Sequence, residues 1–249
     1  MKTIKYDDFL RSFEIKPSDS MSFFFGAGSS MQAGIPGTSQ LVWHFKRKIY
    51  CSIRKEREDK YKDLESSYNQ NIIQSYFNSL GGYPKLYDPI EYSFYFEKCY
   101  QNENDRKYFI QSVVNGVNPS IGHKCLGELI ISKRINRVWT TNFDELIENG
   151  IKLVNNTISI EIFSPETTHL NNDLASQYPK ILKLHGDFRY DKLQNTIQET
   201  KKLNERLSND FKKYFLEHGL IVIGYSGNDE SVIDVFDSLL EKMTFQMQR

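Results

Sequence analysis

The chain has 249 residues, and its 32 Lys plus Arg are balanced by 32 Asp plus Glu. This length can bury one sizeable core and favours a single large domain with an insertion. A neutral chain has no net field that would draw it to nucleic acid or to an anionic membrane, so its ligand must be recognised locally. Cys51, Cys99 and Cys125 form no CxxC pair, which argues against a disulfide framework and a zinc ribbon and favours a reducing compartment.

The N-terminal segment is charged and lacks the apolar core of a signal peptide. No stretch of the sequence approaches the roughly 18 apolar residues that cross a bilayer. We therefore expect a soluble, cytoplasmic protein.

Four short apolar segments predict buried strands, because each opens into a polar or glycine-containing turn. They are Ser22–Phe25, Arg137–Thr140, Lys180–Leu184 and Leu220–Ile223. Strands that are apolar on both faces belong to parallel sheets covered by helices. The sequence therefore predicts an α/β fold with a doubly wound, mostly parallel, Rossmann-like sheet.

Apolar residues at helical spacing predict a helix after the first strand and a last helix over Glu230–Met243. Residues 52–115 lie between the first two strands, are rich in polar and aromatic side chains, and show no clear strand. We expect them to form an inserted, mostly helical subdomain. Its aromatics suit either a mobile lid over a ligand cleft or, more commonly, the core of a small helical layer. Because no strand follows the last helix, residues 1–249 are expected to form one domain at the N-terminal end of a longer protein.

A glycine-rich turn, residues 26–30 (GAGSS), follows the first strand, where a doubly wound sheet places a nucleotide. Glycines let the backbone approach a pyrophosphate, whose oxygens accept bonds from free N–H groups and hydroxyls. The third glycine of the dinucleotide fingerprint and its acidic ribose ligand are missing. A plain strand-to-helix turn is therefore an equal alternative.

A second polar turn, Thr140–Asp144 (TTNFD), follows the second strand segment. Ligands of open α/β sheets bind outside the carboxyl ends of the strands, so Asn142 and Asp144 are candidates for substrate contacts. The alternative is that one of them caps the next helix.

Two more polar turns complete the set. His185, beside Gly186, can serve as an acid or base near neutral pH, although a lone histidine is more often structural. Residues 224–229 (GYSGND) suit ribose or adenine contacts, or a simple turn in which Asp229 caps the last helix. Because all four turns follow parallel strands, we expect them to converge on one edge of the sheet.

The ordered motifs GAGSS, GIP, TTNFD, LHGD and GYS resemble the sirtuin family, in which NAD lies across the carboxyl edge of a doubly wound sheet. The resemblance spans roughly residues 23–237 and leaves the insertion unmatched. In its details the chain is most similar to the bacterial sirtuin-like domains of antiphage defence, which consume NAD. Carried over residue by residue, the resemblance implies that Asn142 and His185 are catalytic. It implies NAD contacts for Gly26, Ala27, Gly28, Ser29, Ile35, Pro36, Thr141, Asp144, Gly224 and Ser226.

The chain departs from sirtuin deacylases at two places. After the GIP segment it continues with Gly37, Thr38 and Ser39, where deacylases have the Phe and Arg that cover the reacting sugar. The two CxxC pairs of the deacylase zinc module are absent, so no metal is implied. Both departures put an acyl-peptide acceptor in doubt and leave water as the expected acceptor.

The resemblance therefore implies an NAD hydrolase that releases ADP-ribose and nicotinamide and defends its host by NAD depletion. One alternative is a module that senses NAD or an ADP-ribose derivative, which would not need Asn142 and His185 together. Another, less favoured, is a protein deacylase or ADP-ribosyltransferase, which needs an acceptor groove. Because unchecked hydrolysis would kill the host, we expect control by a homo-oligomer or by an Argonaute-like or sensor partner, acting through a C-terminal region. We expect no direct contact of this domain with nucleic acid or membrane.

Overall fold

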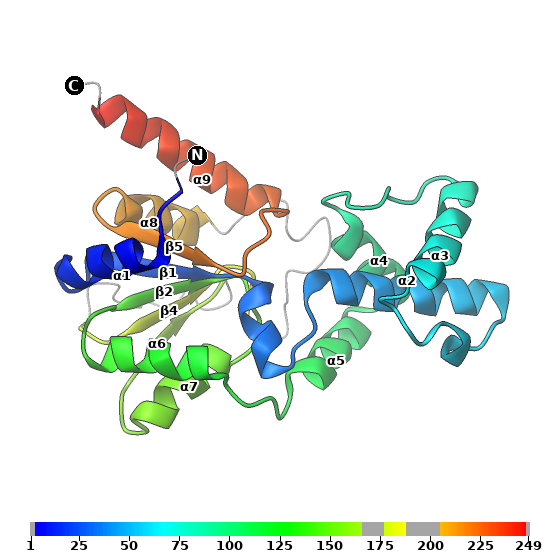
Figure 1. Ribbon diagram of the computed structural model, residues 1–249, viewed down its shortest axis with the longest axis horizontal. Helices are drawn as coiled ribbons and strands as arrows, with labels where there is room; N and C mark the ends of the chain where they lie inside the picture. The colour runs from blue at the N-terminus through cyan, green and yellow to red at the C-terminus, as the bar shows by residue number, and fades with distance from the viewer. Residues whose placement is uncertain (1–2, 166–176, 188–204, 248–249) are drawn as a thin grey trace.

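The computed structural model of the protein describes residues 3–165, 177–187 and 205–247, with side chains up to residue 241. Figure 1 shows an α/β body joined to a group of helices. The α-helices (α), 3-10 helices (η) and strands (β) follow in the order α1 (Tyr6–Ile15), β1 (Met21–Phe25), η1 (Ala27–Ala33), α2 (Thr38–Arg54), η2 (Glu58–Tyr61), α3 (Ser67–Leu80), α4 (Glu91–Cys99), α5 (Glu103–Val114), α6 (Ile121–Ile131), β2 (Arg137–Thr140), α7 (Leu146–Val154), β3 (Glu161–Phe163), β4 (Lys180–Lys183), α8 (Glu205–Phe215), β5 (Gly219–Ile223) and α9 (Glu230–Met247).

The described strands form one parallel sheet in the order β3-β4-β2-β1-β5. This confirms the predicted doubly wound α/β fold. The four predicted strand segments correspond to β1, β2, β4 and β5, with ends that differ by at most one residue. The sequence analysis missed β3, a three-residue edge strand with only one buried side chain. Such a short, half-exposed segment lacks the continuous apolar pattern that marked the inner strands.

Helices cover both faces of the sheet, as Figure 1 shows. On one face, Phe24 of β1, Trp139 of β2 and Leu182 of β4 lie in register and pack against α8 and α9. The alternate residues Val138 and Ile181 face the other way and pack against α6 and α7. Helices thus cover both faces of β1, β2 and β4, which explains their apolar composition. The predicted burial of the fourth segment is wrong, because Val222 and Ile223 of the edge strand β5 are exposed.

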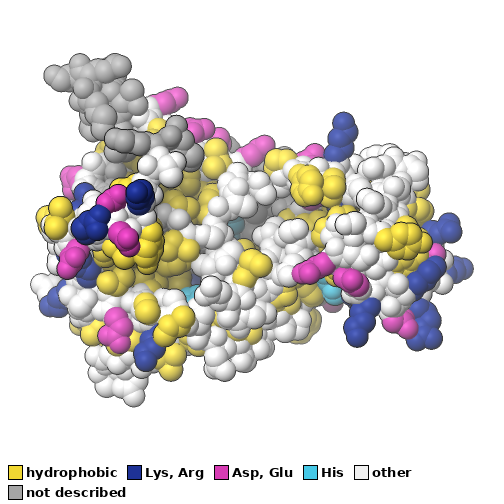
Figure 2. Space-filling model, viewed as in Figure 1, with side chains coloured by type: hydrophobic (Ala, Val, Ile, Leu, Met, Phe, Trp, Pro, Cys, Tyr) yellow, Lys and Arg dark blue, Asp and Glu magenta, His cyan; other side chains and the backbone are white. Residues whose placement is uncertain are grey.

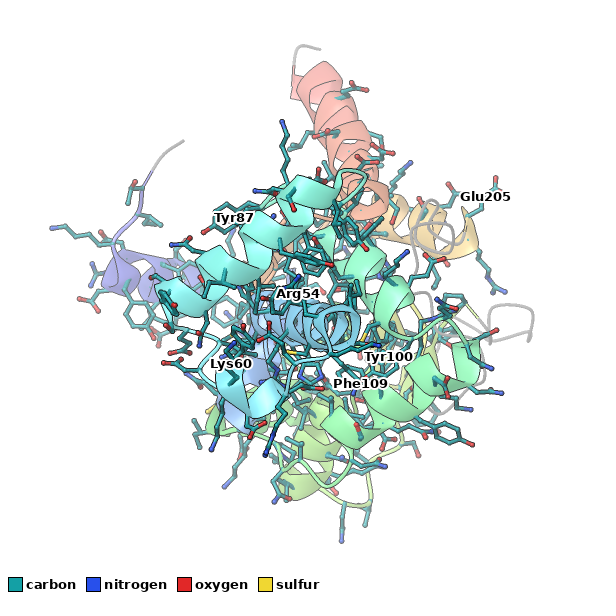
Figure 3. The ribbon with its side chains drawn as sticks, turned by 90° about the vertical axis from the view of Figure 1, so that its right-hand side faces the viewer. Arg54, Lys60, Tyr87, Tyr100, Phe109 and Glu205 are labelled. Carbon is teal, nitrogen blue, oxygen red and sulfur yellow. The ribbon has the colours of Figure 1, made fainter. Side chains whose placement is uncertain are left out.

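A second core lies within the helices at the far end of the molecule. Figure 3 looks along α2, which is surrounded by α3, α4 and α5 and places Tyr100 and Phe109 side by side. The aromatic side chains from residues 52–115 that pack in or against this core are Tyr61, Tyr76, Phe77, Tyr83, Tyr92, Phe94, Tyr95, Phe96, Tyr100 and Phe109. Tyr87 is instead exposed. These contacts give the aromatics the role of a helical core, and a lid function for the segment stays a prediction.

One buried lysine of α2 contacts both α3 and α4 within this helical core. The Lys46 side chain on α2 is fully buried, and its Nζ donates to Gln74 Oε1 of α3 over 2.7 Å. The same Nζ contacts the Glu91 carboxylate of α4 and lies 4.9 Å from the centre of the Tyr95 ring. Burial lowers the pKa of Lys46, while the adjacent carboxylate opposes this shift.

Among the described residues, no helix combines the length and the hydropathy needed to span a membrane.

The close crossing of α6 and α7 requires glycine at Gly150. A Cβ at this position would lie 2.6 Å from the backbone oxygen of His123. We predict that Gly150→Ala lowers the free energy of unfolding by about 1–3 kcal/mol, because the overpacked helices must move apart. Urea denaturation followed by circular dichroism measures this loss.

Gly122 of α6 provides the matched control. A Cβ there meets nothing closer than Ser120 Oγ at 3.6 Å, so Gly122→Ala should keep or slightly raise stability. Equal unfolding midpoints for both variants would contradict the proposed close contact.

Candidate active site

Four polar turns meet at one edge of the sheet, at the carboxyl ends of the adjacent strands β4, β2, β1 and β5. These strand ends point toward the helical group of α2–α5 (Figure 1). The chain moves from β1 to β2 on one side and returns to β5 on the other, so the strand order reverses at β1. In open α/β sheets, ligands bind at such a switch point.

The turn after β1 contacts the turn after β5, backbone against backbone. The Gly26 N–H donates to Ile223 O over 3.0 Å, and the Gly28 N–H donates to Gly224 O over 2.8 Å. A Cβ on Gly26 would lie 2.6 Å from Tyr225 Cα, and Gly224 has a φ of +66°. Glycine is therefore required at these positions because the two turns of the chain approach each other closely.

Most backbone amides of the glycine-rich turn already have partners within the protein, and the binding of a pyrophosphate by this turn stays a prediction. The Ser29 N–H is also engaged, since it donates to Gly26 O over 3.0 Å. Of the four residues predicted to bind the phosphates, Gly26, Gly28 and Ser29 thus use their N–H groups inside the protein, and Ala27 begins η1.

Asn142, in the turn after β2, is bound to the glycine-rich turn. Its Nδ2 donates to Gly26 O over 3.1 Å, to Ser29 Oγ over 3.2 Å and to Ser30 Oγ over 3.0 Å. Because a backbone carbonyl only accepts, this contact assigns the nitrogen of the amide to that side. The Oδ1 atom is then the group that Asn142 has for accepting a bond from a ligand or a water.

Ser30 joins the two polar residues of the β2 turn. It is 1% exposed, and its Oγ donates to Asp144 Oδ2 over 2.8 Å. The other oxygen of Asp144 accepts the N–H of Leu146 over 3.0 Å, so the alternative of a helix-capping role is correct for this carboxylate. The sequence analysis assigned no role to Ser30, although it forms part of the GAGSS motif.

A buried lysine lies beneath these turns. Lys183 Nζ at the end of β4 donates to Asp144 O over 2.7 Å and pairs with Glu148 Oε1 of α7 at 2.7 Å and with Asp187 Oδ2 at 3.0 Å. Burial raises the pKa of the Glu148 carboxyl, although Lys183 opposes the shift. Burial tends to lower the pKa of Lys183, but the two carboxylates outweigh it, so this pKa is raised. The sequence analysis assigned no site role to Lys183, Glu148 or Asp187.

His185 lies beside this network and is 7% exposed. Its Nε2 is 2.8 Å from Oδ2 of Asp229, which lies in the turn after β5. The two atoms are close enough for an interaction, but the N–H bond of Nε2 does not point along the line to the oxygen. Burial opposes ionisation of Asp229, but His185 and Ser231 outweigh it and lower the pKa of this carboxyl.

Asp229 also caps α9, as predicted, because its Oδ1 accepts the Ser231 N–H over 3.0 Å and the Ser231 hydroxyl over 2.7 Å. The contact with His185 was missed. It joins turns from β4 and β5, which are separated in the sheet by two strands, and no local spacing predicts such a pair.

The remaining predicted residues lie around this edge with fewer contacts. Ile35 is nearly buried, and its N–H donates to Ser30 O, whereas Pro36 is half-buried. The Thr141 N–H donates to Phe25 O over 3.1 Å. Ser226 is exposed on the turn after β5.

The helical group carries a separate shallow hollow, lined by Glu56, Arg57, Asp59 and Lys60. Its charges pair with one another, with Arg57 2.8 Å from Asp59 and Lys60 2.6 Å from Glu56. Figure 2 shows Lys and Arg gathered at this end of the molecule together with Asp and Glu. Self-neutralised surface charges of this kind do not form a site comparable to the sheet edge.

Among the residues that the structure describes, no three His, Cys, Asp or Glu side chains gather in an arrangement suited to a metal ion.

Comparison with known proteins finds a family model that matches part of the chain. Residues 136–249, which include the turns after β2, β4 and β5, match the model of the SIR2-like domain. This match confirms the predicted resemblance to the sirtuins. Members of this family are NAD-dependent enzymes. No curated protein sequence matches the chain.

Two sirtuin structures are among the solved structures that match the chain. One is Sir2Tm bound to a propionylated peptide, with 15% identity, a TM-score of 0.43, and coverage of 94% of this chain and 83% of that chain. The other comes from work on the structural basis of sirtuin substrate affinity, with 13% identity, a TM-score of 0.45, and coverage of 94% and 84%.

Removal of the Ser30 hydroxyl should weaken the link between the two turns. We predict that Ser30→Ala lowers the free energy of unfolding by about 1–3 kcal/mol, since the buried Asp144 Oδ2 loses the hydroxyl that donates to it. Ser112→Ala is the control, because that exposed hydroxyl bonds only its own helix backbone. Chemical denaturation of both variants tests this difference, and a loss no larger than that of the control would refute it.

Replacement of the buried lysine should be more severe. We predict that Lys183→Met costs about 3–5 kcal/mol of unfolding free energy, because it leaves Glu148 and Asp187 as uncompensated buried carboxylates. Lys152→Met on the exposed side of α7 should have almost no effect. Thermal and urea unfolding of the two variants distinguish a buried network from a general effect of charge removal.

Proposed function

We propose that the protein hydrolyses NAD to ADP-ribose and nicotinamide. The observation that carries the proposal is the placement of Asn142 and His185 on one sheet edge, within a chain whose residues 136–249 match the SIR2-like domain model. The sequence lacks the zinc cysteines and the Phe-Arg pair of the deacylases. Water therefore replaces an acyl-peptide as the acceptor.

In the proposed reaction the bond between the ribose carbon and the nicotinamide nitrogen breaks, and its electron pair leaves with nicotinamide. A water oxygen then attacks the ribosyl cation, and the proton that it loses passes to His185 and on to solvent. Asn142 Oδ1 accepts a hydrogen bond from this water and orients it. A general base in this position contributes on the order of 100-fold to 10,000-fold to the rate.

Asp144 has a supporting role in this proposal. Its carboxylate binds Ser30 and the start of α7, and so it fixes the turn that presents Asn142. A contact between Asp144 and the nicotinamide carboxamide stays a prediction. The same holds for contacts with NAD of the other predicted residues, Gly26, Ala27, Gly28, Ser29, Ile35, Pro36, Thr141, Gly224 and Ser226.

The biological role that we propose is NAD depletion in antiphage defence, in the cytoplasm. It rests on the similarity of the motifs to bacterial sirtuin-like defence domains. An enzyme of this kind needs control, which we assign to self-association or to an Argonaute-like or sensor partner.

The first experiment measures NAD consumption and identifies the products by liquid chromatography. We expect ADP-ribose and nicotinamide from the wild-type protein, and at least a 100-fold lower rate from Asn142→Ala and from His185→Ala. Asn104→Ala, an exposed asparagine on α5, should retain the wild-type rate. Thermal melts check that each variant is folded, and calorimetry measures NAD binding.

The outcomes separate the candidate functions. NAD binding without turnover, unchanged by addition of an acetylated peptide, would refute hydrolysis and favour a sensing module. Nicotinamide release that depends on an acylated peptide would favour a deacylase. Absence of NAD binding would refute the proposed function altogether.

A further inference from the structure

We propose that Asp229 is a positioning residue that holds the His185 imidazole in the tautomer and orientation needed for base catalysis. This inference rests on the proposed NAD hydrolysis, and it assigns a role to a residue outside the motifs that the sirtuin resemblance supplied. The two residues come from different turns, after β4 and after β5, and meet at an Nε2–Oδ2 distance of 2.8 Å.

Two hydrogen bonds from Ser231 fix the orientation of the Asp229 carboxylate. Asp229 Oδ1 accepts both the N–H and the hydroxyl of Ser231, which leaves Oδ2 directed at His185. The first turn of α9 follows directly, and the positive end of a helix dipole favours a negative charge there. The Asp229 side chain is 18% exposed, so solvent screens the pair only in part.

The contact has a direct consequence for the ring. A carboxylate next to one imidazole nitrogen keeps the proton of the neutral ring on that nitrogen, and the opposite nitrogen then retains its lone pair. In His185, Nε2 carries the proton and Nδ1 is the base that accepts a proton from the attacking water. The negative charge of Asp229 also stabilises the imidazolium that forms in this step. In the protein without substrate, the N–H bond of His185 Nε2 is not aligned with Asp229 Oδ2. Catalytic hydrogen bonds of this kind commonly become shorter and better aligned when substrate binds.

The alternative is that Asp229 serves only as the cap of α9. Substitution by Asn separates the two roles, because Asn caps a helix as well as Asp does but carries no charge. Asp229→Asn therefore keeps the cap and removes the electrostatic partner of His185. Asp234→Asn is the matched control, since it removes an exposed carboxylate from the same helix.

The kinetic test compares kcat, KM and the melting temperature of these variants. We expect Asp229→Asn to lower kcat by about 100-fold to 10,000-fold, the range for a misdirected general base, with little change in KM or melting temperature. In the His185→Ala background, Asp229→Asn should cause no further loss, because Asp229 acts through that ring. A wild-type kcat in Asp229→Asn, or losses that multiply in the double variant, would overturn the proposal.

A second measurement does not depend on turnover. The ring 15N chemical shifts of His185, assigned by their loss in His185→Ala, report which nitrogen carries the proton. We expect Nε2–H in the wild-type protein and a changed tautomer population in Asp229→Asn, with no change in Asp234→Asn. Identical spectra for wild type and Asp229→Asn would refute the pair. A protein that fails to hydrolyse NAD but shows the expected spectra would refute the proposed function and leave the pair intact.

Discussion

The candidate site depends on a positive charge buried under the sheet edge. Lys183 binds the backbone of the turn after β2, the first turns of α7 and the segment that follows His185. Desolvation of an ammonium group is costly unless several oxygens replace its hydration shell, and here three do so. Lys183 thereby fixes its partners relative to one another. Because Asp144 and Asp187 follow closely after Asn142 and His185, the same lysine holds the two turns that carry the amide and the imidazole.

The sequence predicted the parts of the fold that are determined by local pattern. β1, β2 and β4 are apolar on both faces because helices cover both sides of the sheet, and this burial gives a continuous apolar pattern that half-exposed strands lack. β5 was predicted from the same apolar pattern, although Val222 and Ile223 are exposed at the sheet edge. The parallel arrangement then implied that the polar turns share one edge. β3 escaped prediction because a short edge strand with one buried residue has no such pattern.

Contacts between distant turns were not predictable from the sequence in the same way. Gly26 and Gly28 were expected to accommodate a phosphate, but their lack of a side chain is needed for the approach of Gly224 and Tyr225. Asp229 was identified as a cap from its place before α9, and its second contact depends on the position of β4, which two strands separate from β5. Composition and spacing indicate which residues are polar and where turns occur, whereas the packing of one turn on another follows only from the assembled sheet.

Asp229, the proposed positioning residue, lies directly before α9, and this helix runs outward along the upper side of the molecule (Figure 1). A rigid helix transmits a displacement of its outer end to its first residue. A shift of about 1 Å in a positioning group can change a rate roughly 100-fold. In the proposed mechanism the orientation of α9 is therefore a mechanical variable, because a load on its outer end changes the Asp229–His185 geometry without any contact with the substrate.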